Sequence, residues 1–262
     1  MEFISQFAGS DMFWIGLSLF LIGMGKGGFP VGAVALPLLI LAWPAQAQAA
    51  RQAVGFMLPM LCLMDAVAMA FYRRHVLWGR LIFLMPATLL GVAVASFLFV
   101  SNEAVVAVSD RMLKILIGSL GILFVAYFVS KKWILGRIHA TVPDWSRGSV
   151  FGFAAGITST MAHSAGPVIQ MYLLPQQLDK KKFAGTSCAF FWMLNLIKLL
   201  PFSLMGRIEA DNLKLGFVLL PVIPLGVAFG WWLTHLTQQK HYMLLIYVVL
   251  LITSVTLIVK SL

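Results

Sequence analysis

Charged residues are scarce in this chain of 262 residues, making up 11% of it against 61% hydrophobic residues. Soluble domains carry about 25% charged residues, so the composition excludes a soluble globular protein. The charge-free runs 81–100, 215–234 and 242–259 approach the roughly 20 apolar residues that cross a bilayer as a helix. A transmembrane β-barrel would instead show alternating segments of about ten residues. We therefore predict an all-α polytopic membrane protein.

Cysteines and acidic residues are also few. The two cysteines, Cys62 and Cys188, both lie in apolar runs, which argues against a disulfide framework and a zinc site. The 19 Lys and Arg residues outnumber nine acids, but they lie in short loops, where positive-inside topology and anionic lipid account for them. No nucleic-acid partner, metal or cofactor is expected, and the oligomeric state stays open. The first residues contain no Lys or Arg, unlike a signal peptide.

Two apolar segments are interrupted near their middle by small and polar residues. The first, 12–43, contains Gly-Met-Gly-Lys-Gly-Gly-Phe-Pro at 23–30, and the second, 150–174, contains Thr-Ser-Thr-Met-Ala-His-Ser-Ala-Gly-Pro at 158–167. Interrupted segments in corresponding positions indicate the binding site of a transporter. The remaining apolar segments bring the number of hydrophobic elements to about eight: 50–72, 80–100, 112–130, 183–205, 214–236 and 242–260.

An internal repeat relates the two interrupted segments. Residues 84–98 align with 219–233 at a constant shift of 135, with seven of fifteen positions identical. Both interrupted segments precede these blocks by a similar distance. We therefore predict two homologous halves, 1–130 and 148–262, joined by a basic cytoplasmic linker at 131–147 within one integral membrane domain.

The charge distribution favours a re-entrant hairpin for each interrupted segment. If each segment crosses the membrane once, Lys and Arg outside the spans divide ten against seven, whereas hairpins divide them eleven against six. The stronger bias fits the positive-inside rule better. Three full spans per half then invert the second half relative to the first and put both termini outside the cytoplasm. Each hairpin arm would be shorter than a full span, and the two tips would meet near the midplane.

The tips have the residues of an anion site. Gly25, Gly27 and Gly28 let the chain turn and expose N–H groups, and a proline follows each tip where a returning helix would begin. Helix N-termini aimed at the midplane attract negative charge. Lys26 is costly in an apolar segment unless it faces an anion or a wet path. Donors at the second tip are Thr158, Ser159, Thr160, His163, Ser164 and the backbone of Gly166.

Structural alternatives stay open for these side chains. Lys26 could snorkel or balance Asp65, and the hydroxyl groups could bond back to helix carbonyls. Asp65 and Asn195 lie in the second element of each half, separated by nearly the shift of the repeat. Asp65 could carry a coupling proton, or it could form a structural pair with Lys26 or a hydrogen bond between helices. Lys198 is expected to snorkel near a helix end.

The residues that carry a family resemblance are the first tip followed by Ala-Leu-Pro-Leu-Leu at 35–39, Phe-Tyr-Arg-Arg-His at 71–75, and Gly-Thr-Ser at 185–187. Along nearly its whole length the chain resembles the sulfite exporter TauE/SafE family of bacterial permeases. The resemblance implies a multi-pass inner-membrane transporter of sulfite, sulfonates or related sulfur-containing or organic anions, cradled by Gly25, Gly27, Gly28 and Gly166. The second tip has Ala-His-Ser-Ala-Gly in place of a denser glycine run, which leaves the substrate open.

Three functions remain to be compared. The leading one is a secondary transporter of a small anion that works by alternating access around the tips. An anion channel with the tips as its filter is the first alternative. A membrane-embedded enzyme using His163 and Ser164 is the second, although the sequence contains neither H-E-x-x-H nor G-x-S-x-G. We therefore do not expect an enzyme.

Overall fold

Helices account for the regular structure of this protein, as expected from its composition. The computed structural model describes residues 9–31, 39, 49–101, 115, 118–119, 121–126, 129–130, 142–163, 165–208 and 210–259, and none of these is in a β-strand. Three helices in these ranges are long and apolar enough to cross a membrane, Gly55–His75, Lys180–Leu204 and Gln239–Thr256, and Met85–Leu98 and Val222–Leu236 are shorter apolar helices. The chain is an all-α polytopic membrane protein.

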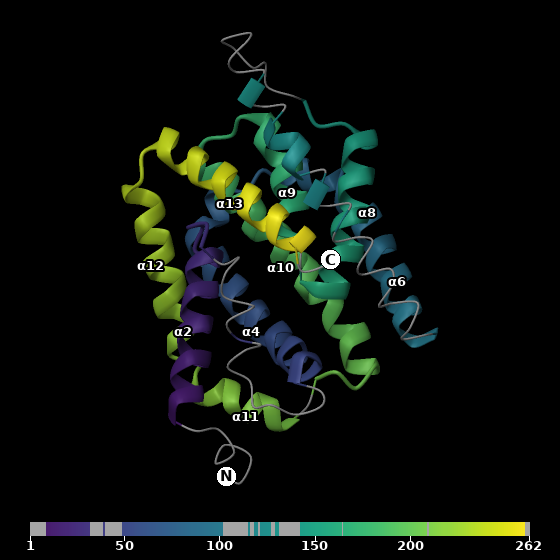
Figure 1. Cartoon of the computed structure of the whole chain (residues 1–262), viewed down its shortest axis with the longest axis vertical. Helices are drawn as coiled ribbons and strands as arrows, with labels where there is room; N and C mark the ends of the chain where they lie inside the picture. The colour runs from purple at the N-terminus through teal and green to yellow at the C-terminus, as the bar shows by residue number, and fades with distance from the viewer. Residues whose placement is uncertain are drawn as a thin grey trace. The chain divides into compact units, whose positions relative to one another are not determined.

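The helices form two compact units, each built from two separate stretches of the sequence. Unit 1 comprises Met1–Val76 and Ser187–Gln238, and unit 2 comprises Leu77–Thr186 and Gln239–Leu262. Unit 1 contains α2 (Gly9–Lys26), α4 (Ala49–Tyr72), η2 (Arg73–His75), most of α10 (Lys180–Leu204), α11 (Ala210–Val218) and α12 (Val222–Leu236) (Figure 1). Unit 2 contains α5 (Trp78–Ile82), α6 (Met85–Ser101), α8 (Trp145–Ala162), α9 (Gly166–Leu173), η3 (Leu174–Gln176) and α13 (Gln239–Val259).

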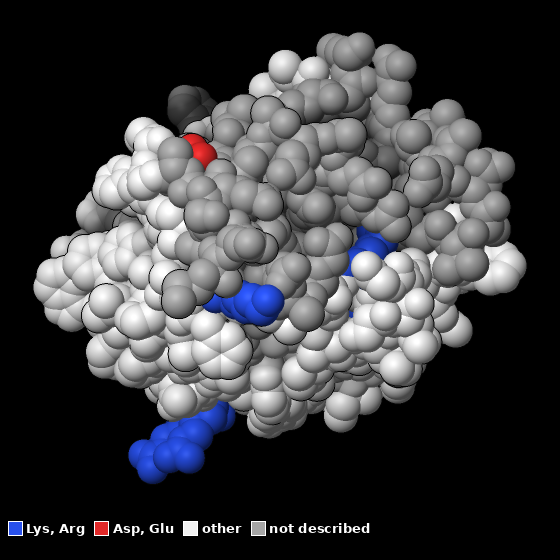
Figure 2. Space-filling view, turned by 90° about the horizontal axis from the view of Figure 1, so that it is seen from below, with Lys and Arg blue, Asp and Glu red and all other residues white. Residues whose placement is uncertain are grey.

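Apolar side chains both fill the units and cover their surface. In unit 1, Ile15 and Leu19 of α2 pack with Met57 and Met64 of α4 and with Val227 of α12. Many large apolar side chains are nevertheless exposed, and the described surface in Figure 2 is mostly uncharged, with Lys and Arg at only a few places. An outward apolar surface is what contact with lipid requires.

Proline divides two of the expected elements at equivalent positions of the repeat. Residues 80–100 form α5 and α6, with a break just before Pro86, and residues 214–236 form α11 and α12, with a break at Pro221. Pro86 and Pro221 are related by the same shift that aligns the two blocks of the sequence repeat. Proline lacks the N–H that would continue the preceding helix and disfavours helical geometry in the residue before it. The two breaks therefore fall at equivalent positions of the predicted repeat, and the division into two homologous halves stays a prediction.

Glycine contacts pair the interrupted segment of one half with a helix of the other half. In unit 1, α2 lies along α12 (Figure 1), and the backbone of Gly226 approaches that of Gly23 and the carbonyl of Phe20. In unit 2, α8 lies along α6, and Gly91 approaches Gly156. Gly91 and Gly226 are again equivalent positions of the repeat. In both units, therefore, an interrupted helix packs on its neighbour with the two backbones in contact. The interrupted helix comes from the first predicted half in unit 1 and from the second in unit 2.

The second interrupted segment folds back on itself. Phe151 near the start of α8 and Tyr172 near the end of α9 have ring centroids 5.9 Å apart, which a segment crossing once could not achieve. The arms span 18 and 8 residues, so only the second is clearly shorter than a full span. The long arm begins inside the expected linker because Asp144 caps it by accepting a 2.7 Å hydrogen bond from the N–H of Arg147. The corresponding return arm of the first segment, 32–38 and 40–48, lies outside the described residues.

The glycine contacts predict a test with a matched control. A Cβ at Gly226 would lie 2.6 Å from the carbonyl oxygen of Phe20, whereas one at Gly79 would meet nothing within 4 Å. We expect Gly226→Ala to lower the free energy of unfolding by about 1–3 kcal/mol, and Gly79→Ala to leave it unchanged or raise it. Thermal unfolding in detergent measures both. Equal stability of the two variants would contradict the close packing of α2 on α12.

Candidate functional site

A buried ion pair joins the end of α2 to the middle of α4. The Nζ of Lys26 lies 2.8 Å from Oδ1 of Asp65, whose side chain is fully buried. The other carboxylate oxygen accepts a 2.7 Å hydrogen bond from the Nδ2 of Asn195 on α10. Three helices thus meet at one carboxylate, and both of its oxygens have partners. Lys26 could snorkel or pair with Asp65, and in the structure it pairs with Asp65.

An aromatic ring also contacts the ammonium group of Lys26. Its Nζ lies 4.7 Å from the centroid of the Phe191 ring on α10. A ring face attracts a cation without neutralising it. Lys26 is also the last residue of α2, where the partial negative charge of the helix C-terminus favours a cation. Its ammonium group is therefore fixed by a carboxylate, a ring and a helix end.

The first tip is a Schellman turn. Gly28 has a φ of 98°, which an L side chain rarely adopts. Its N–H donates to the carbonyl of Gly25 and that of Phe29 to the carbonyl of Met24, each at 3.1 Å. These are the two hydrogen bonds of the motif. The N–H groups are thus engaged within the tip, and the anion-cradling role of Gly25, Gly27 and Gly28 stays a prediction.

Gly27 allows the tip to approach two other helices. A Cβ on it would collide with the carbonyl of Val227 and the N–H of Trp231 in α12. Its N–H donates to the carbonyl of Gly23 at 2.8 Å, and its carbonyl accepts a 2.8 Å hydrogen bond from the hydroxyl of Tyr72 on α4. The glycine therefore positions the adjacent Lys26.

The second tip ends α8 with a histidine in the left-handed conformation. His163 has a φ of 49°, and its N–H donates to the carbonyl of Ser159 at 3.0 Å. It occupies the repeat position of Gly28, so a residue with a side chain is strained where the other half has glycine. The predicted helix start is confirmed, because α9 begins at Gly166 with proline in its first turn. Ser164 lies outside the described residues.

The threonines of the second tip are bonded to their own helix. Thr158 and Thr160 donate 2.8 Å hydrogen bonds to the carbonyls of Ala154 and Gly156, and both side chains are buried. Ser159 is buried beside them. The hydroxyls of the two threonines therefore bond back to carbonyls of their own helix, as the structural alternative predicted. Substrate binding by Ser159, Thr160, His163 and Gly166 stays a prediction, as does the meeting of this tip in unit 2 with the first tip in unit 1.

Sequence reasoning misjudged Lys198. The side chain is fully buried on α10 instead of snorkelling to water. It lies three residues after Asn195, and positions three apart share a helix face. That spacing was a signal in the sequence that Lys198 lies on the same face of α10 as Asn195.

No metal centre is evident in the described ranges, which contain no group of three or more His, Cys, Asp and Glu residues suited to an ion. Cys188 is buried, with its Sγ 3.8 Å from the carbonyl oxygen of Asp65, and Cys62 is partly buried.

Apolar spans that bury an ion pair beside an interrupted helix define a membrane transport protein. Residues 12–257 match the family described as Sulfite exporter TauE/SafE. The match covers nearly the whole chain, and the protein belongs to this family of transporters. No curated protein and no solved structure matches the chain.

The strained histidine predicts a separation of stability from activity. His163→Gly removes the cost of a left-handed L residue, so we expect the free energy of unfolding to stay equal or rise by up to about 1 kcal/mol. If the side chain binds substrate, anion flux into proteoliposomes should fall. Gln177→Gly is the matched control, because Gln177 has the same φ of 49° and should keep its flux. Unchanged flux in His163→Gly would remove His163 from the site.

Proposed function

We propose that this protein is a secondary transporter of the bacterial inner membrane that moves a small sulfur-containing or organic anion by alternating access. The observation that carries the proposal is the buried Lys26–Asp65–Asn195 cluster at the first tip, in a chain of the sulfite exporter TauE/SafE family. A buried cation at an interrupted helix is a site for an anion once its internal partner is displaced or neutralised.

Asp65 is the coupling group in this proposal. Its carboxylate holds the Lys26 ammonium at 2.8 Å and so competes with a substrate anion for the same cation. A proton on Asp65 cancels its charge and frees Lys26 for the substrate. Proton and anion then bind together and move in the same direction, and Asn195 keeps its hydrogen bond to the acid.

An anion channel is the second candidate, because the same cluster could serve as a filter. The two functions differ in energetics. A channel lets an anion run down its own gradient, whereas a coupled carrier saturates and accumulates the anion against its gradient. Uphill accumulation driven by a proton gradient therefore favours the carrier.

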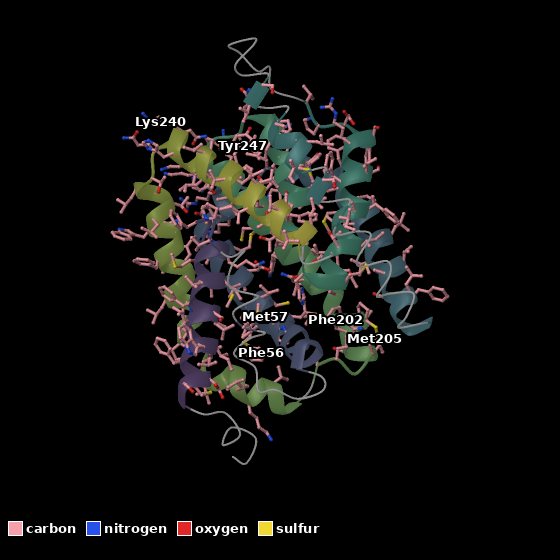
Figure 3. All side chains as sticks on the ribbon, in the orientation of Figure 1. Phe56, Met57, Phe202, Met205, Lys240 and Tyr247 are labelled. Atoms are coloured by element: carbon pink, nitrogen blue, oxygen red, sulfur yellow. The ribbon has the colours of Figure 1, made fainter. Side chains whose placement is uncertain are left out.

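A proteoliposome panel tests the proposal. Uptake of sulfite, thiosulfate, methanesulfonate and acetate is measured with and without an inward proton gradient. We expect saturable uptake of at least one sulfur anion, a fall of about tenfold or more in Lys26→Ala because a hydrogen bond to a charged group is lost, and no response to the gradient in Asp65→Asn. Lys240→Ala, on an exposed side chain (Figure 3), is the control. Unchanged flux in Lys26→Ala would overturn the site.

A further inference from the structure

The starts of α10 and α13 are joined in unit 2. The Oε1 atom of Gln239 accepts a 2.7 Å hydrogen bond from the N–H of Lys180, and its Nε2 donates one of 3.1 Å to the carbonyl of Leu178. Slightly further along the two helices, the rings of Phe183 and Tyr242 meet edge to face with centroids 6.3 Å apart. Both helices are long and apolar enough to cross a membrane, so their joined starts lie at one membrane surface.

Helix α13 has one buried face and one exposed face. On the buried face, residues at every fourth position are at most 1% exposed: Tyr242, Ile246, Leu250 and Ser254. About 200° around the helix, Leu244, Val248 and Ile252 are 58%, 43% and 52% exposed. Lys240 is exposed four residues before Leu244, at the start of α13 in Figure 3. The exposed face therefore carries a cation at the membrane surface and an apolar stripe beneath it.

Positive charge is in excess around the joined starts. Asp179 is the one acid within 177–186 and 239–245, two stretches that the structure describes in full. It accepts hydrogen bonds of 3.1 Å and 3.0 Å from the N–H groups of Lys181 and Lys182, and its Oδ2 lies 3.4 Å from the Nζ of Lys182. Four lysines, at 180–182 and 240, thus stand against one carboxylate. Because Asp179 caps the first turn of α10, a ligand would meet lysine side chains here and not these N–H groups.

Tryptophan marks the same side of unit 2. Trp78 begins α5 and Trp145 begins α8, and they are 49% and 56% exposed. The N–H of Leu77 donates a 3.1 Å hydrogen bond to the Oγ1 of Thr186 near the start of α10, and the ring centroids of Phe83 and Trp145 lie 5.0 Å apart. Tryptophan is enriched at the boundary between lipid and water, at the level of the headgroups. The lysines therefore lie where phospholipid headgroups begin.

We propose that the joined starts of α10 and α13 bind an anionic phospholipid. The headgroup phosphate pairs with Lys240 and the lysines of α10, and an acyl chain lies along the apolar stripe Leu244, Val248 and Ile252. A zwitterionic headgroup carries a cation of its own, so the excess of lysines selects a headgroup with a net negative charge. The stripe selects a lipid over a free anion, because a soluble anion has no apolar surface to bury.

This lipid site is separate from the proposed transport site. It belongs to unit 2, whereas the Lys26 cluster belongs to unit 1, and its occupant is a component of the membrane and not the cargo. Replacement of Lys240 should therefore leave anion flux unchanged. Lipid binding is measured without transport, so either proposal can fail without the other.

The test uses the full-length protein in an uncharged detergent, titrated with phosphatidylglycerol or phosphatidylcholine and followed by native mass spectrometry. We expect phosphatidylglycerol to bind about tenfold more tightly or better. Each lysine near an anionic headgroup contributes about fivefold to binding, so Lys181→Gln combined with Lys240→Gln should raise the Kd for phosphatidylglycerol by about tenfold or more. The matched control is Arg73→Gln combined with Arg74→Gln, which removes the same charge from two exposed side chains of unit 1 and should keep the wild-type Kd.

Two further measurements separate a lipid from a free anion. Leu244→Ser combined with Val248→Ser should raise the Kd for phosphatidylglycerol by about fivefold or more, because apolar contact with the acyl chain is lost. Inorganic phosphate at the concentration of the lipid should not compete with it. Unchanged affinity in this serine variant, or competition by inorganic phosphate, would show an anion site without a lipid and overturn the proposal.

Two other outcomes would also overturn it. Equal affinity for the two phospholipids would remove the selection by charge. An equal loss of affinity in the lysine and arginine double variants would show a diffuse effect of net charge, which does not depend on position.

Discussion

The ion pair between Lys26 and Asp65 is the interaction around which unit 1 is arranged. An isolated charge in a protein interior or a membrane costs several kcal/mol, so each partner depends on the other. The pair brings the end of α2 to the middle of α4, and Asn195 adds α10 through the second carboxylate oxygen. Tyr72 then ties the tip backbone to α4. Glycine is needed at position 27 because a Cβ there would collide with the backbone of α12.

A buried pair of this kind adds little net stability, because desolvation offsets most of the attraction. Two apolar residues of similar volume would serve the fold as well. In the proposed function, a proton on Asp65 and a substrate anion at Lys26 replace the pair together, so that neither buried charge is left without a partner.

In each unit, a helix from one predicted half of the chain packs on a helix from the other half. In unit 1 the interrupted helix of the first half lies on α12 of the second, and in unit 2 the interrupted helix of the second half lies on α6 of the first. Both contacts depend on glycines at equivalent positions of the repeat, Gly91 and Gly226. Because the backbones touch at these glycines, a Cβ at Gly91 or Gly226 would collide with the backbone of the neighbouring helix.

Much of the fold could be predicted because apolar runs, glycine and proline act locally. The helical class, the interrupted segments and the start of α9 at Gly166 follow from such signals and are confirmed. The breaks at Pro86 and Pro221 were missed because proline near a helix start is compatible with helix. The burial of Lys198 depends on helices distant in sequence, and so does the choice of α12 as the partner of α2. No local pattern encodes such contacts.

Lys26, Asp65 and Asn195 could also be predicted as site residues from the sequence, because polar groups in apolar runs are few. It could not foresee that the tip amides bond to their own helix, since a Schellman turn depends on backbone geometry that glycine allows without requiring. The left-handed conformation of His163 was not predicted either, because histidine rarely adopts it.

A double-mutant cycle between Lys26 and Asp65 tests the central claim most directly. The free energy of unfolding is measured for Lys26→Met, Asp65→Asn and the double variant, and the double variant is also assayed for flux of a sulfur anion that the wild type takes up. The account predicts that each single change costs about 3–5 kcal/mol, that the double variant recovers most of this loss with a coupling energy above about 2 kcal/mol, and that it no longer transports that anion. Single effects that simply add, or a double variant that still transports the anion, would contradict it.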